Sequence, residues 1–146
     1  MAIIVLISCV SRKLNHKAKA SDLYQSPLFK YALRYAKLLK ADHINILSAK
    51  YNLLKLDDII EPYDETLNIM KDAQIWEWSQ KVIEQLEDSY DMDNDEFIFL
   101  AGERYRKYLI RKMKKYSVPM KGLGIGKQLY FLKKNTKDKH KLNDKN

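Results

Sequence analysis

The sequence has a single cysteine, Cys9, and only three histidines, His16, His43 and His140. One thiol cannot form the disulfide framework that stabilises many small secreted domains. The histidines share no spacing typical of a metal site, so we expect neither a metal nor another cofactor. Long apolar runs are also missing, because the apolar stretch at residues 2–7 is too short for a signal peptide or a membrane span. These absences favour a cytoplasmic protein that does not enter a membrane.

The chain has 146 residues, of which 46% are hydrophobic, as is typical of a folded globular protein. Chains of this length usually close one hydrophobic core, so we expect a single domain over residues 1–134. Residues 135–146 consist mostly of Lys, Asp and Asn, with one apolar residue, Leu142. Their composition predicts a basic disordered tail.

Positive charge is concentrated near the end of the chain. Residues 1–102 hold 12 Lys and Arg against 16 Asp and Glu, a net charge of −4, whereas residues 103–146 hold 15 against 3, a net charge of +12. This asymmetry indicates an anionic partner such as nucleic acid or a nucleotide. The alternative is a solvated lysine-rich helix face that has no partner.

Three short apolar segments, residues 2–7, 43–47 and 97–100, have the composition of buried strands. Helical spacing of apolar residues predicts helices that alternate with them, over residues 27–40, from Asp72 onward, over 103–116 and over 128–134. Strands that alternate with helices form an open sheet with parallel neighbours. The expected fold class is therefore α/β: a three-layer, open, mostly parallel sheet with helices on both faces, in a single domain.

A polar segment follows each predicted strand: SCVSRK, SAKYN and AGERY. In open α/β sheets, ligands bind beyond the carboxyl ends of the strands. We therefore expect six side chains to converge at one edge of the sheet: Ser8, Ser11, Lys13, Lys50, Glu103 and Tyr105. Ser48 and Tyr51 belong to the same segments and are also expected to contact the ligand.

The charged and nucleophilic candidates have ordinary alternatives. Lys13 and Lys50 could hold a phosphate or carboxylate, or could simply point into solvent. Cys9 could be a nucleophile, or a small core residue. Glu103 and Asp64 are the candidate catalytic carboxylates. Glu103 could instead only stabilise a helix start, and Asp64 could only cap a turn.

Aromatic and glycine-rich segments complete the candidate site. Tyr24 and Tyr63 are expected on loops, where they could stack on a base. Residues 122–126, GLGIG, lack the strand that precedes a dinucleotide fingerprint and the ending of a P-loop. They predict a tight turn that could bring Lys127 and Gln128 near the ligand.

Six motifs occur in order along residues 3–132: Cys9-x-Ser-x-Lys13, Leu23-Tyr-x-Ser-Pro-Leu-Phe29, Leu47-Ser-Ala-Lys-Tyr-x-Leu-Leu54, Pro62-Tyr-Asp-x-Thr-Leu67, Ala101-Gly-x-x-Tyr105 and Gly122-Leu-Gly-Ile-Gly-x-Gln-Leu129. This series resembles a family of small bacterial and phage proteins of unknown function that is linked with the YaaA peroxide-stress proteins. Asn52 stands where that family usually has glycine, and asparagine is the residue that best replaces glycine at positive φ. Tyr130 and Phe131 stand where the family commonly has a tryptophan, which should affect packing more than chemistry.

The resemblance implies DNA binding and protection against oxidative DNA damage. It also implies a fold similar to the uracil-DNA-glycosylase-like domain, which has been suggested for part of archaeosine synthase too. It carries over no catalytic residue.

The first functional hypothesis is a domain that handles nucleic acid or a nucleobase and could act at a glycosidic bond or a modified base. In this hypothesis a basic 104–121 helix and the tail follow the nucleic-acid backbone. The second is a non-catalytic protein that protects DNA or sequesters a nucleotide. The third is an enzyme that acts on small molecules unrelated to nucleic acid.

Overall fold

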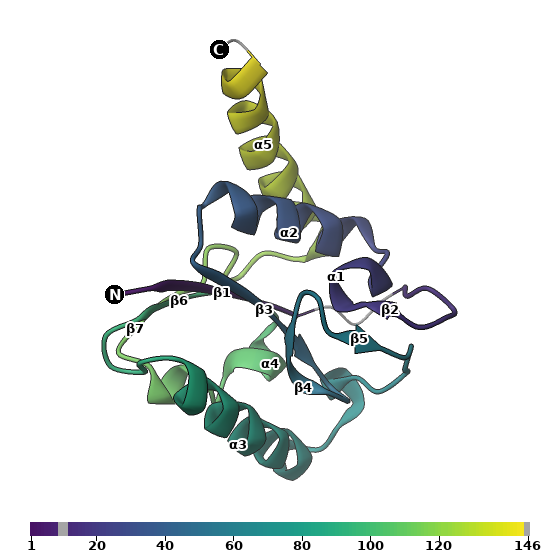
Figure 1. The fold of residues 1–146 in the computed structure, drawn as a ribbon, viewed down its shortest axis with the longest axis vertical. Coiled ribbons are helices and arrows are strands. Elements are labelled where there is room, and N and C mark those ends of the chain that lie inside the picture. The colour runs from purple at the N-terminus through teal and green to yellow at the C-terminus, as the bar shows by residue number, and fades with distance from the viewer. Residues whose placement is uncertain (9–11, 145–146) are drawn as a thin grey trace.

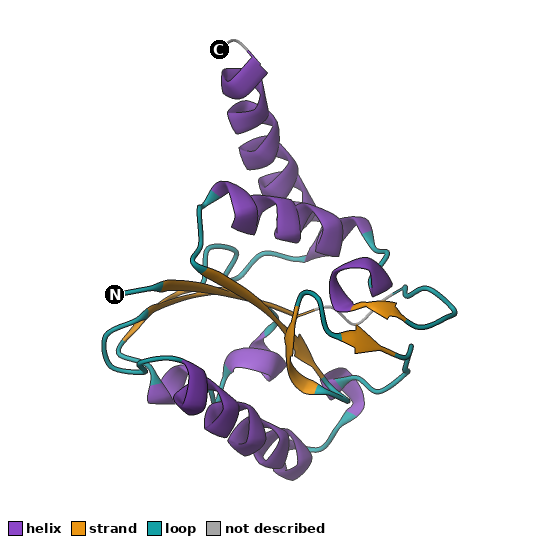
Figure 2. Ribbon diagram, in the orientation of Figure 1, coloured by secondary structure: helices purple, strands orange, loops and turns teal. Residues whose placement is uncertain are grey.

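The computed structural model describes residues 1–8 and 12–144, which form a single α/β domain. At its centre is a five-stranded sheet in the order β4-β3-β1-β6-β7 (Figures 1 and 2). These strands are β1 (Ile3–Ser8), β3 (His43–Ser48), β4 (Asn52–Lys55), β6 (Glu96–Leu100) and β7 (Lys115–Ser117). Each neighbouring pair is parallel except β3 and β4, which are antiparallel. The three strands expected from apolar runs are the three central ones, and the mostly parallel sheet is confirmed.

Helices cover both faces of this sheet, as Figure 1 shows. The helices α2 (Pro27–Leu38) and α5 (Ile125–Asp144) lie on one face, while α3 (Asp72–Ser89) and the short α4 (Glu103–Arg106) lie on the other. Shorter elements complete the described chain: β2 (Ala18–Lys19) and β5 (Ile59–Ile60), which pair antiparallel, helix α1 (Ala20–Leu23), and the 3-10 turns η1 (Leu67–Ile69) and η2 (Ile110–Lys112). Within the described residues, no helix combines the length and apolar character needed to cross a membrane.

Strand β1 is buried on both faces, which explains its uninterrupted apolar run. Side chains alternate along a strand, so Val5 and Ile7 pack into the core beneath α2 and α5, and Ile4 and Leu6 pack into the core beneath α3. All four are fully buried.

The prediction of a continuous helix over residues 103–116 is wrong. Tyr105, Leu109 and Met113 are buried as expected, but α4 ends at Arg106, and after η2 the chain becomes extended at Met113. The following β7 then pairs with β6. Pairing between strands distant in sequence outweighs local helical spacing, which carries no information about that partner.

The last helix is longer at both ends than the expected 128–134. It begins at Ile125 and continues to Asp144, through residues expected to form a disordered tail. Beyond Lys134 the helix keeps apolar and hydrogen-bonded contacts, since Thr136 is buried and its hydroxyl donates to the Leu132 carbonyl at 2.7 Å. The end of the folded domain at residue 134 stays a prediction.

Candidate active site at the carboxyl edge of the sheet

A cavity of about 430 Å³ lies between the carboxyl ends of β1 and β6, and we call it the sheet-edge cavity. Its wall includes Ser8, the last residue of β1, and Leu100, the last residue of β6, with Ala101 and Gly102 directly after it. From β1 the chain continues to α2 on one face of the sheet, whereas from β6 it continues to α4 on the other face (Figure 1). The cavity therefore occupies a topological switch point, where open α/β sheets usually bind their ligands.

Two long helices begin at this cavity. Helix α2 contributes Ser26 and Leu28 from its first turn, and α5 contributes Ile125 and Leu129. The start of a helix carries partial positive charge, and its first N–H groups have no partner within the helix. Two such starts at one cavity favour a ligand that carries negative charge.

The polar groups of the cavity wall are few and are held in place by hydrogen bonds. The Ser8 hydroxyl accepts from the Gly102 N–H at 3.3 Å. The Tyr105 hydroxyl accepts from the Leu67 N–H at 3.3 Å. The Gln128 side-chain amide donates to the Leu123 carbonyl at 2.8 Å. Most of the remaining wall is apolar, a combination typical of sites for aromatic or partly apolar small molecules.

Glu103 lies beside the sheet-edge cavity in a smaller recess of about 220 Å³. Ala101, Gly102, Met120 and Gln128 line both spaces. Glu103 is exposed in the first turn of α4, so its carboxylate can reach a ligand from the recess without being buried.

A second group of expected site residues lines a separate open groove of about 510 Å³, which we call the tyrosine groove. Arg12, Lys13, Tyr63 and Asp64 contribute to its walls. The Lys13 ammonium lies 4.4 Å from the centre of the Tyr63 ring and 5.8 Å from that of Tyr24. These contacts place Lys13 against aromatic faces rather than in the sheet-edge cavity.

Tyr24 and Tyr63, which were expected to offer their rings to a base, are both buried. Tyr24 is fully buried and Tyr63 is 8% exposed. Their hydroxyl groups lie 2.5 Å apart in a hydrogen bond. Both rings belong to the same buried cluster as Phe29 and Ala32 of α2.

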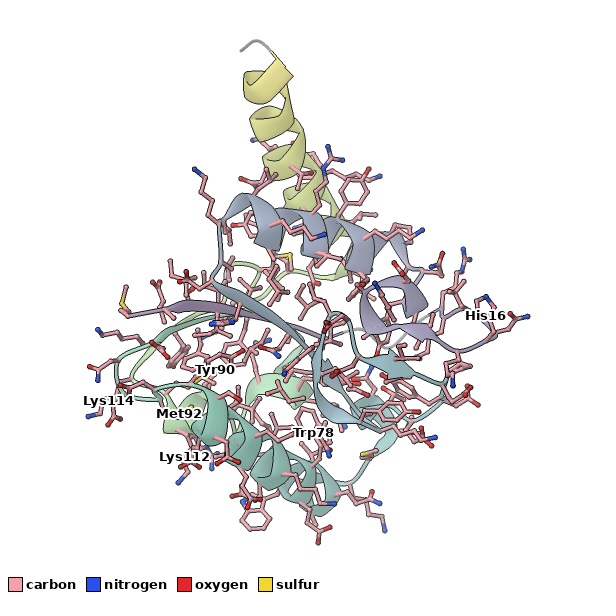
Figure 3. All side chains as sticks on the ribbon, viewed as in Figure 1. His16, Trp78, Tyr90, Met92, Lys112 and Lys114 are labelled. Carbon is pink, nitrogen blue, oxygen red and sulfur yellow. The ribbon has the colours of Figure 1, made fainter. Side chains whose placement is uncertain are left out.

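The segment after β3 forms a turn outside the sheet-edge cavity. Ser48 is fully buried, and its hydroxyl accepts from the Tyr51 N–H at 2.9 Å. The Ser48 carbonyl accepts from the indole N–H of Trp78 at 2.8 Å. Figure 3 shows Trp78 on α3, below the sheet. Lys50 is exposed, with its ammonium 5.4 Å from the centre of the Tyr51 ring.

The expected single cluster is thus divided. The structure brings Ser8, Tyr105 and Gln128 to the sheet-edge cavity and Glu103 to its recess. The other described candidates lie in the tyrosine groove, its buried wall or the β3 turn: Lys13, Tyr24, Ser48, Lys50, Tyr51, Tyr63 and Asp64. Cys9 and Ser11 lie outside the described residues.

Sequence reasoning missed part of the wall: Ser26, Leu28, Asn68, Met120 and Ile125. A signal for the first two was present, because Ser26 and Pro27 mark a helix start. A helix that follows a strand begins at that strand's carboxyl edge, so its first turn belongs to the site region. Among the described residues, no three His, Cys, Asp or Glu side chains are grouped to hold a metal ion.

The fold and the cavity define an α/β domain with a cavity at a topological switch point. The chain belongs to a family of unknown function, DUF6884, whose sequence model matches residues 4–134. No curated protein matches the chain.

Proposed function

We propose that this protein binds a nucleobase or nucleotide in the sheet-edge cavity, free or within a nucleic acid, and acts at its glycosidic bond or on a modified base. The observation that carries the proposal is the pairing of an apolar cavity with two helix starts. A nucleotide has the matching chemistry, since its base is a flat apolar-faced ring and its phosphate is an anion.

The residues have distinct roles in this proposal. Gln128 and Tyr105 supply polar groups that can read the edge of a base, while the first turns of α2 and α5 face the phosphate. Glu103 supplies a carboxylate that can give or take a proton from the adjoining recess. Because the Glu103 side chain lies in the recess and not in the apolar wall, its carboxylate can reach the sugar that is attached to a base held in the cavity.

The six ordered motifs also support a function in nucleobase or nucleic-acid binding. We infer from them a relationship to the YaaA proteins and to the uracil-DNA-glycosylase-like fold. Ser8, Gly102, Tyr105 and Gln128 all belong to or adjoin those motifs and line the cavity. Motif residues also line the tyrosine groove, where Lys13, Tyr63 and Asp64 lie.

A cavity-filling substitution tests the proposal. Gly102 has φ −66°, which any residue can adopt, and a Cβ placed there meets no atom within 4 Å. Gly102→Leu should therefore preserve the fold while it occupies cavity space. Ser117→Leu is the control, because Ser117 is exposed on β7 and does not line the cavity.

Titration calorimetry with the common nucleoside monophosphates is the measurement, with ribose 5-phosphate as a probe that lacks the base. We expect Gly102→Leu to weaken nucleotide binding at least about tenfold, Ser117→Leu to leave it within about twofold, and ribose 5-phosphate to bind more weakly than the nucleotides. Equal affinity in both variants, or no nucleotide binding by the wild type, would contradict the proposal.

One observation favours a non-catalytic binder as the second candidate function. Among the described residues, the wall of the sheet-edge cavity contains no carboxylate or histidine, and Glu103 lies only in the recess. A protein that sequesters a nucleotide or protects nucleic acid needs no proton-transfer group. Incubation of tightly bound nucleotide or oligonucleotide with excess protein distinguishes the two, because only the enzyme yields product.

A further inference from the structure

Helix α2 and the first twelve residues of α5 carry basic residues and no acidic ones. On α2, Lys30, Arg34 and Lys37 are spaced four and three residues apart, so they share one side of the helix. All three are exposed, and α2 contains no Asp or Glu.

Helix α5 continues this charge. Lys127, Tyr130 and Lys134 are spaced three and four residues apart and are exposed, and residues 125–136 contain no Asp or Glu. Tyr130 is 68% exposed, unlike its neighbour Phe131, whose ring packs on Tyr35 of α2 with centres 5.6 Å apart.

The two helices are joined at Tyr31 of α2. The Lys133 ammonium from α5 lies 5.6 Å from the centre of the Tyr31 ring. We call the six cations together with Tyr130 the α2/α5 basic surface: Lys30, Arg34, Lys37, Lys127, Lys133 and Lys134.

The basic segment expected to follow a nucleic-acid backbone, residues 104–121, lies in different surroundings. Lys107 pairs with Asp72, and Lys114 lies 3.7 Å from Asp93. The Arg106 guanidinium donates to the Ala101 carbonyl at 2.7 Å.

That segment also faces the acidic side of the molecule. Helix α3 carries five acidic residues: Asp72, Glu77, Glu84, Glu87 and Asp88. Figure 3 shows Lys112 and Lys114 on the α3 side of the sheet, away from α5. Acidic neighbours reduce the attraction of these cations for a polyanion, which favours α2 and α5 as the contact surface.

We propose that the α2/α5 basic surface binds the backbone of a single-stranded nucleic acid, and that one nucleotide of the strand enters the sheet-edge cavity. The second part rests on the function proposed above. Both helices begin at the cavity wall, and Lys30 and Lys127 are next in sequence to the cavity-lining residues Phe29 and Gln128. An exposed tyrosine between two lysines suits a single strand, whose unpaired bases stack on aromatic rings while lysines contact phosphates.

Fluorescence anisotropy with labelled single-stranded oligonucleotides over a salt series tests the surface. The first variant combines Lys30→Gln, Arg34→Gln and Lys37→Gln, and the second combines Lys127→Gln, Tyr130→Ala and Lys134→Gln. The matched control combines Lys81→Gln, Lys112→Gln and Lys115→Gln, three exposed lysines on or near the acidic side. Circular dichroism melting checks that each variant is folded.

We expect each surface variant to lose at least about tenfold in affinity. The slope of log K against log salt should also fall by about 2 in the first variant, which loses three cations, and by about 1.4 in the second, which loses two. The control should change affinity less than about threefold. A control that loses as much as the surface variants, a wild type that prefers duplex with the same salt slope, or no oligonucleotide binding would each overturn the proposal.

Calorimetry with nucleoside monophosphates on the same proteins separates this inference from the proposed function. Surface variants that keep mononucleotide affinity but lose the oligonucleotide support both. Unchanged oligonucleotide affinity with intact mononucleotide binding overturns only the surface. A third outcome is that the wild type binds no mononucleotide while the surface variants lose affinity for the oligonucleotide. That outcome supports the backbone site and overturns the role of the cavity.

Discussion

The hydroxyl groups of Tyr24 and Tyr63 form a hydrogen bond of 2.5 Å between residues 39 positions apart in the chain. Their rings meet edge to face, with centres 6.3 Å apart. Tyr24 follows α1 and Tyr63 follows β5, so this pair joins the segment that leaves β1 to the segment that leaves the small antiparallel sheet. Lys13 lies over both rings, and both Lys13 and Tyr63 line the tyrosine groove.

Tyr63→Phe should destabilise the protein by about 1–2 kcal/mol, because it removes one partner of a buried hydrogen bond. Urea unfolding followed by circular dichroism measures the change. Tyr116→Phe, at a tyrosine that is 47% exposed, is the control and should shift stability by less than about 0.5 kcal/mol. The double variant with Tyr24→Phe should cost less than the sum of the two single changes, since both remove the same bond. Strict additivity would show that the hydroxyl pair contributes no coupling.

Asp95 should make stability sensitive to acid. Its carboxylate accepts from the Ala2 N–H and the Asp91 N–H, each at 2.8 Å. These backbone hydrogen bonds, with that from Ala2 the larger, lower the pKa of Asp95. The lowered pKa contributes stability that is present above the unfolded-state value, about 3.9, and is lost as the pH falls through the folded-state value.

Asp95→Asn should therefore cost about 2 kcal/mol near neutral pH. The difference from wild type should stay constant between about pH 5 and 8 and shrink below about pH 4. Urea unfolding across that range is the measurement, and Asp57→Asn at an exposed carboxylate is the control. A difference that grows as the pH falls would have the opposite sign and would contradict this assignment.

The turn between β3 and β4 depends on a positive φ at Asn52, which the structure places at 65°. Asn52→Gly should be neutral or stabilise by up to about 1 kcal/mol, because glycine adopts this conformation without a Cβ clash. Asn52→Val should destabilise by about 1–2 kcal/mol. Thermal melting compares the three proteins, and equal melting temperatures for the Gly and Val variants would show that the turn is not held at positive φ in solution.

Much of the fold could be predicted from the sequence because its signals are local. The apolar run of β1, the helix start at Ser26 and the positive φ at Asn52 each depend on a few neighbouring residues, and each is found as expected. Strand β7 could not be predicted in this way, since residues 115–117 become a strand only through pairing with β6.

The position of the candidate site at the sheet edge could be predicted from the sequence, whereas the full set of side chains that line it could not. Parallel strands fix the edge at which Ser8 and Tyr105 meet, so topology alone identified them. The directions of Lys13 and Tyr24 depend on packing under α2 and against Tyr63. The spacing of residues in the sequence does not predict those contacts. The division of the expected cluster between a cavity and a groove could therefore not be predicted.

The last prediction concerns Glu103 and Asp64, the two candidate catalytic carboxylates. Glu103 lines the recess that adjoins the sheet-edge cavity, whereas Asp64 lines the tyrosine groove. Proton transfer requires hydrogen-bond reach of the reacting atom, so the positions favour Glu103.

Glu103→Gln should lower the rate of base release from bound nucleotide or oligonucleotide by about 10²–10⁴-fold. Its mononucleotide affinity should stay within about twofold of wild type, because the amide keeps the size of the side chain. Asp64→Asn is the matched change and should lower the rate less than about tenfold. Chromatography of free base under single-turnover conditions, with protein in excess, is the measurement. The reverse order of effects would move the proton-transfer step to the tyrosine groove, and the absence of released base in the wild type would leave binding without turnover as the function of the cavity.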